Sequence, residues 1–97
     1  MLGGTSWIST IEYYKKINMM ISEAKGNFNS AKISMHSINY APIKSQYNDL
    51  SSNNIQELLW NEILELMKSA PDCLILCNNF LHTFSHKIVF WYWIIFC

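Results

Sequence analysis

The chain alternates segments of helical periodicity with short segments of strand periodicity. Apolar residues recur every three or four positions over 8–24 and again over 55–68, which is the spacing of an amphipathic helix. A short strand pattern follows each helical segment, at 31–40 and at 73–76. This alternation is typical of α/β domains with a parallel sheet, whose functional loops follow the carboxyl ends of the strands. We therefore expect a parallel-sheet α/β domain.

The first helix is predicted to begin near Ser9, because Ser9 and Glu12 have the spacing of a capping box. Gly26 provides a stop signal at its carboxyl end. Trp7 and the pair Tyr13-Tyr14 are expected to anchor this helix on the sheet, with an aromatic platform for a substrate as the alternative. The residues expected on its buried face are Ile8, Ile11, Tyr14, Ile17, Ile21 and Ala24.

The second helix is predicted over 55–68, after a polar segment at 44–54 that indicates a loop, with a short helical turn as the alternative. Ala41-Pro42 ends the strand pattern that precedes this loop. In that strand, the expected apolar face consists of Ala31, Ile33 and Met35. The second helix is expected to bury Ile55, Leu58, Leu59, Ile63, Leu66 and Met67, and to leave Glu57, Glu62 and Glu65 in solvent.

Length and charge exclude several classes of function. The 97 residues allow one small domain at most, or part of a larger fold. Seven basic residues, all lysine and scattered along the chain, balance seven acidic ones, so the sequence has no basic patch for nucleic acid. Because the chain contains no arginine, any carboxylate that it binds must be held by lysine, hydroxyl, side-chain amide or backbone N–H groups.

The cysteine content and the two ends of the sequence predict a cytoplasmic protein without a membrane partner. The three cysteines are odd in number and unevenly spaced, which does not fit a disulfide framework. The residues around Met1 lack the basic and apolar regions of a signal peptide. The apolar segment 88–97 is shorter than the roughly 20 residues that cross a bilayer. We divide the chain into a domain at 1–87 and an apolar tail at 88–97.

Cys77 lies where a short apolar strand pattern meets a helix start. The strand pattern at 73–76 precedes it, and Asn78 or Asn79 is a favoured N-cap residue type. Amide groups at the start of a helix stabilise a thiolate, which lowers the pKa of a cysteine in that position. Cys77 is therefore a candidate base, and a buried structural thiol is the alternative.

Cys73 and Cys77, followed by His82 and His86, also have the spacing of a zinc site with two cysteine and two histidine ligands. A strand would separate the two sulfurs by about 13 Å, at about 3.3 Å per residue, whereas a single zinc ion binds each sulfur at about 2.3 Å. We therefore expect no metal site. His82 is expected in the first turn of the next helix as a packed or solvent-facing residue, and a role in orienting or tuning Cys77 is the alternative.

Three motifs, in order along the chain, resemble those of the aspartate/glutamate racemase family. They are Gly3-Gly4-Thr5-Ser6-Trp7-x-Ser9-Thr10-x-x-Tyr13-Tyr14-x-x-Ile17-Asn18, then Ser30-Ala31-Lys32 with His36-Ser37-Ile38-Asn39-Tyr40-Ala41-Pro42-Ile43, and Leu76-Cys77-Asn78-Asn79-Phe80-Leu81-His82. The resemblance covers about 1–87 and implies the first of two similar α/β domains, with the active site in the cleft between them. The tail at 88–97 has no counterpart in the family.

The resemblance implies an amino-acid racemase that acts on aspartate or glutamate without a cofactor. In this family one thiolate removes the α-proton of the amino acid and a thiol on the opposite face returns one. Cys77 matches the first of these two cysteines, and the second belongs to the second domain, beyond Cys97. We therefore expect this chain to have little or no activity by itself.

The resemblance also implies residues that would bind the substrate. Thr5, Ser6 and Asn79 would line one sheet edge and hold carboxylates through hydroxyl, amide and backbone N–H groups, with ordinary loop and cap roles as the alternative. Asn78 and Phe80 stand where the family usually has threonine, so two hydroxyl groups that would help to hold substrate are absent here.

Two further functions stay open at this point. The chain is alternatively a non-catalytic remnant that binds a partner through its sheet edge and the apolar tail 88–97, because uncharged segments rich in aromatic and β-branched residues associate readily. A homodimer in which each copy contributes one Cys77 to a shared cleft is the other alternative.

Overall fold

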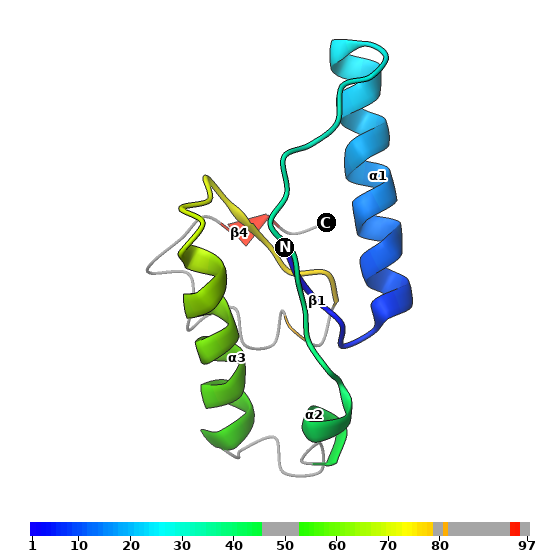
Figure 1. Cartoon of the computed structure of the whole chain (residues 1–97). Helices are drawn as coiled ribbons and strands as arrows, with labels where there is room; N and C mark the ends of the chain where they lie inside the picture. The colour runs from blue at the N-terminus through cyan, green and yellow to red at the C-terminus, as the bar shows by residue number, and fades with distance from the viewer. Residues whose placement is uncertain (46–52, 79–80, 82–93, 96–97) are drawn as a thin grey trace.

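The computed structural model describes residues 1–45, 53–78, 81 and 94–95. The elements are β1 (Leu2–Gly3), α1 (Trp7–Lys25), β2 (His36–Ser37), α2 (Ala41–Ser45), α3 (Asn53–Met67), β3 (Leu74–Ile75) and β4 (Ile94–Ile95). Helices and strands alternate along most of this order, and α1 and α3 lie on opposite sides of the strands (Figure 1). The predicted α/β class is therefore confirmed.

The strands pair in parallel. β1 pairs with β2, and β3 pairs with β4, while a parallel bridge between Leu2 and Leu76 joins the two pairs. The resulting order is β2-β1-β3-β4, so the chain passes through α1 to one side of β1 and then through α3 to its other side. The strand order reverses between β1 and β3, and open parallel sheets bind their ligands at the carboxyl ends of strands at such a point.

The hydrophobic core lies between α3 and the strands. Ile55, Leu59 and Ile63 of α3 are buried, and Leu58 and Met67 are half-buried. The members of the core cluster are Leu2, Ile38, Ile43, Ile55, Leu59, Ile63, Leu66, Leu74, Leu76 and Leu81. The predicted helix and its buried face are therefore confirmed, with a start two residues earlier than predicted.

Glu62 differs from the other glutamates that were predicted to face solvent. Its Oε2 lies 3.2 Å from Nδ1 of His36 in β2, and both side chains are about one-third exposed. Glu57 and Glu65 are exposed, as predicted. The pair between His36 and Glu62 therefore joins β2 to α3.

The ends of α1 confirm one prediction and correct another. The helix begins at Trp7 and its N-cap is Ser6, whose side chain accepts a 3.3 Å hydrogen bond from the Ser9 N–H. The predicted start near Ser9 is therefore two residues late, because the hydroxyl that caps the helix is that of Ser6 and not that of Ser9. Gly26 ends the helix as predicted, with a φ of 94° that favours glycine.

The predicted buried face of α1 is wrong. Ile8, Ile11 and Tyr14 are 62%, 53% and 49% exposed, and Trp7 does not anchor the helix, because it is 63% exposed. Ile17, Ile21 and Tyr13 are half-buried, Ala24 is exposed, and the buried residue of the helix is Thr10. The physical reason is that apolar residues occur on several sides of α1, so their spacing does not determine which side meets the sheet.

The strand predicted over 31–40 is shorter, and its inward face changes part-way along the segment. Ala31 and Ile33 are half-buried, as predicted, whereas Met35 is exposed. β2 contains His36–Ser37, and from this strand on the less exposed positions are the even-numbered ones, with Ile38 buried. α2 then begins where the strand pattern was predicted to end, and the Asn39 side chain accepts a 3.2 Å hydrogen bond from the Ala41 N–H. Most of the loop predicted at 44–54 lies outside the described residues.

Two residues of the predicted tail belong to the sheet. Ile94–Ile95 form β4, in parallel register with Leu74 and Ile75 of β3. The boundary at 87 between domain and tail stays a prediction. Across the described part of the chain, no helix is both long and apolar enough to span a bilayer.

Candidate active site at the carboxyl ends of β1 and β3

The carboxyl ends of β1 and β3 meet where the strand order reverses. Gly3-Gly4-Thr5 follows from β1, and Cys77 follows directly after the strand residues of β3 and the bridge at Leu76. The Cys77 N–H donates a 3.0 Å hydrogen bond to the Leu2 carbonyl. Cys77 therefore lies beside the glycine turn, although 74 positions separate it from Gly3 in the sequence.

Glycine is required at the turn because other parts of the backbone come very close. Gly4 has a φ of 95°, and a Cβ atom there would collide with the backbone of Ile38, just beyond β2. A Cβ atom on Gly3 would collide with the side chain of Thr10 in α1. The absence of side chains thus lets β2 and α1 approach the end of β1.

Two adjacent residues in α1 connect the helix to both strand ends. Thr10 Oγ1 accepts a 3.0 Å hydrogen bond from the Gly4 N–H and donates one of 3.1 Å to the Ser6 carbonyl. Ser9 Oγ donates a 2.6 Å hydrogen bond to the Cys77 carbonyl. Sequence reasoning gave Ser9 a capping role and Thr10 none, although both residues are part of the first motif that resembles the racemases.

Thr5 has a buried hydroxyl group at the end of the glycine turn. Its side chain is 6% exposed, and its Oγ1 makes no hydrogen bond with the described residues. An unsatisfied buried hydroxyl costs about 1–3 kcal/mol, and such groups are rare in folded proteins. Ser6, by contrast, is half-buried and its Oγ accepts the capping hydrogen bond from Ser9.

Cys77 is fully buried, with 0% of its surface exposed. The Leu81 N–H donates a 3.1 Å hydrogen bond to the carbonyl of Asn78, the residue after Cys77. Asn79, the third predicted substrate-binding residue, lies outside the described residues, as does His82. The Cys77 thiol is therefore shielded from solvent in this structure.

The described residues do not form a metal site. No three of their His, Cys, Asp and Glu side chains gather closely enough to hold an ion. His82 and His86, which completed the alternative zinc pattern with Cys73 and Cys77, lie outside the part of the chain that the structure describes.

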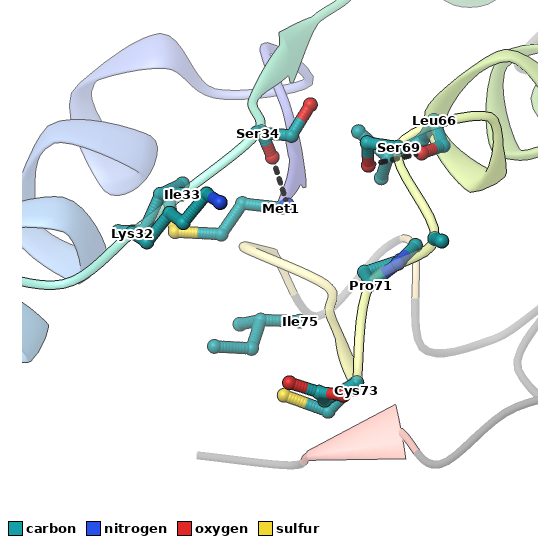
Figure 2. A pocket seen from close by; sticks show the side chains of 11 residues that line it. Met1, Lys32, Ile33, Ser34, Leu66, Ser69, Pro71, Cys73 and Ile75 are labelled. Carbon is teal, nitrogen blue, oxygen red and sulfur yellow. Dashed lines mark hydrogen bonds between the residues drawn. The ribbon is translucent and has the colours of Figure 1, made fainter.

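A pocket of about 360 Å³ lies at the opposite edge, near the amino ends of β1 and β3. Figure 2 shows Met1 and Ser34 on one side of this pocket and Cys73 and Ile75 on another. The Met1 nitrogen donates a 2.6 Å hydrogen bond to the Ser34 carbonyl, and burial lowers the pKa of this amino group. Because parallel sheets bind ligands at the carboxyl ends of their strands, we assign the candidate site to the Cys77 edge.

A comparison with solved structures finds a protein with a similar fold. The chain matches the crystal structure of a "putative Asp/Glu Racemase" from Yersinia pestis with a TM-score of 0.83 and 30% sequence identity. The chain has the fold of part of an Asp/Glu racemase. The racemase match covers 90% of this chain and 38% of the Yersinia protein, so the chain spans little more than a third of that protein's length. No family model matches the chain.

The racemase match confirms the resemblance that the three sequence motifs indicated, and it confirms a fold with a small parallel sheet. The roles of Cys77, Thr5, Ser6 and Asn79 in a racemase reaction stay predictions. Their positions relative to β1 and β3 are the starting point for the functional proposal.

Proposed function

We propose that this chain is the cysteine-bearing part of a cytoplasmic, cofactor-independent racemase that acts on aspartate or glutamate. One observation carries the proposal. The Cys77 N–H is hydrogen-bonded to Leu2 of β1, beside the point where the strand order reverses, within a fold that matches part of a "putative Asp/Glu Racemase". Cys77 serves as one of the two thiol acid/base groups.

The reaction consists of two proton transfers on opposite faces of one carbon. The Cys77 thiolate takes the α-proton, so that the C–H bond breaks, an S–H bond forms and the electron pair passes to the substrate carboxylate. A thiol on the other face then donates its proton to the carbon and becomes a thiolate. Inversion requires both groups, because one base on one face can only return the proton to that face.

The developing negative charge on the substrate needs hydrogen-bond donors, and this chain contains no arginine. Thr5 supports the proposal because its buried hydroxyl has no partner among the described residues and has a proton to donate. The Ser6 hydroxyl accepts from Ser9 in the helix cap, which leaves its own proton for a carboxylate. Asn79 completes the proposed donors.

The 97-residue chain by itself should exchange the α-proton without inverting the amino acid. We would incubate it with each enantiomer of aspartate and glutamate in D₂O and follow deuterium at Cα by NMR. We expect deuterium incorporation into one enantiomer, with inversion by chiral chromatography close to background. The absence of incorporation into any of the four substrates would contradict the proposal.

The Cys77→Ala variant should remove the incorporation of deuterium. Cys73→Ala is the matched control, because it makes the same change at the amino end of β3, away from the proposed site. If the Cys77→Ala variant incorporated as much deuterium as the unmodified chain, Cys77 would be excluded as the base. Racemisation by the unmodified chain well above the Cys77→Ala background would instead support the homodimer with two copies of Cys77 in one cleft.

The exposed side of α1 favours a second candidate function, that of an interaction module. Trp7, Ile11 and Tyr14 are spaced by four and three residues, so they form one stripe along the helix, and all are about half exposed or more. A contiguous exposed apolar surface commonly marks a site of association. Association of the purified chain, measured by light scattering, tests this candidate independently of any substrate.

A further inference from the structure

The hydrogen bond between Ser9 and Cys77 joins the first turn of α1 to the proposed site. It is short, at 2.6 Å, partly buried, and connects residues 68 positions apart. We propose that Ser9 is a positioning residue, which holds the backbone of Cys77 so that its thiol keeps one place at the carboxyl end of β3. This inference rests on the proposed function, in which Cys77 is the base.

Cys77 is held through both polar groups of its backbone. Its N–H donates to the Leu2 carbonyl in β1 at 3.0 Å, and its carbonyl accepts from Ser9 Oγ in α1. The peptide groups on either side of the Cα atom are therefore fixed by two different elements. Because the Cα–Cβ direction follows from those two peptide groups, the bonds also restrict where the sulfur can lie.

Ser9 is itself held in place before any substrate binds. Its N–H donates to Ser6 Oγ in the helix cap at 3.3 Å. The next residue, Thr10, is buried and hydrogen-bonded to the Gly4 N–H. Because Ser9 is itself fixed, its hydrogen bond keeps the backbone of Cys77 in a defined geometry. A reacting side chain requires such a geometry.

Loss of the Ser9 hydroxyl has a defined consequence. The Cys77 carbonyl then lacks its donor from α1, while the Cys77 N–H keeps its hydrogen bond to Leu2 in β1. The chain around Cys77 opens more often, and the thiol samples surroundings other than those of the native site. Both the rate at which the thiol reacts and the dependence of that rate on pH should therefore change.

The test uses the whole chain with Cys73→Ser and Cys97→Ser, which leaves Cys77 as the single cysteine. We would measure its alkylation by iodoacetamide from about pH 6 to pH 10 by mass spectrometry, a range that spans ordinary thiol pKa values. With Ser9→Ala we expect alkylation to be about threefold to tenfold faster, the factor for losing one hydrogen bond, and the midpoint of the pH profile to move. Ser9→Thr retains a donor and should give the parent profile.

Ser22→Ala makes the same side-chain change near the other end of α1 and should leave the profile unchanged. Ser9→Val and Ser9→Thr form a second matched pair, because they have the same shape and differ in the hydroxyl. A Ser9→Ala profile that superimposes on that of the parent would overturn the proposal, as would a Ser9→Thr profile that follows Ser9→Val. Unfolding of both Ser9→Ala and Ser9→Val, seen by circular dichroism, would also overturn the proposal. The hydrogen bond from Ser9 would then support the whole fold and not the position of Cys77 in particular.

The readout needs no substrate, so it separates this inference from the proposed function. A parent chain that incorporates no deuterium into any amino acid contradicts the racemase proposal, and the alkylation profiles still show whether Ser9 holds Cys77. Unchanged alkylation together with Cys77-dependent incorporation contradicts the role of Ser9 alone.

Discussion

The Gly4 N–H donates a 3.0 Å hydrogen bond to the side chain of Thr10, which joins the end of β1 to α1. Thr10 is 4% exposed and its hydroxyl both accepts and donates. Thr5, 6% exposed and close to Gly4 in the sequence, has a hydroxyl with no partner among the described residues. Two buried threonines, one in the glycine turn and one in α1, thus differ in what their hydroxyl groups contribute.

Thr10→Val should lower the free energy of unfolding by about 2 kcal/mol, because it removes both hydrogen bonds and leaves the buried Gly4 N–H unpaired. Valine has the shape of threonine, so the cost comes from the hydroxyl. Urea denaturation of the parent chain and of the variant measures this difference in the free energy of unfolding. A change below about 0.5 kcal/mol would show that the bond to Gly4 contributes little to stability.

Thr5→Val should have the opposite effect and raise the free energy of unfolding by about 1 kcal/mol, since it removes a buried hydroxyl that has no partner. The same variant should incorporate deuterium into the amino acid more slowly, because a proposed donor to the substrate is lost. Destabilisation by Thr5→Val would show that the hydroxyl has a partner in the folded protein, which argues against a binding role.

Gly4→Ala and Gly26→Ala form a matched pair, because the two glycines have φ values of 95° and 94°. At Gly26 nothing lies within 4 Å of an added Cβ atom, so alanine should cost about 1–2 kcal/mol of backbone strain alone. At Gly4 the Cβ atom also collides with the Ile38 backbone, so the cost should be about 3 kcal/mol or more. Equal losses in thermal denaturation would mean that β2 does not pack closely on the turn.

Cys77 should react with iodoacetamide at least about tenfold more slowly than Cys73 in the native protein, because Cys77 is fully buried and Cys73 is half-buried. Peptide mapping by mass spectrometry separates the two sites. In denaturant the two rates should become similar. Faster native modification of Cys77 would place its thiol at the surface.

Ile11→Glu should reduce any concentration-dependent association of the chain by about tenfold or more, because it puts a charge in the exposed stripe of α1. Leu64→Glu is the control, since Leu64 on α3 is a comparably exposed apolar residue outside that stripe. Multi-angle light scattering over a range of concentrations gives the comparison. Equal loss of association in both variants would exclude a specific role of α1.

The sequence predicted α3 well and α1 only in outline. Four inward residues of α3 follow a single helical face that packs on the strands, so its periodicity identified the buried side. α1 has apolar residues on several sides, and its contacts with β1 and Cys77 are made by the small polar pair Ser9 and Thr10. A pattern search for apolar residues cannot find such a contact face.

By itself, the sequence determined the alternation of helices and strands, the glycines of the first turn and the position of Cys77 directly after a strand. These features depend on local propensity and periodicity, which are properties of neighbouring residues. The tertiary structure alone decided that Ser9 binds the Cys77 carbonyl, that the buried Thr5 hydroxyl has no partner in the described part of the chain and that Trp7 is exposed. Each of these depends on segments far apart in the chain, whose approach follows from the order of the strands and cannot be read from local spacing.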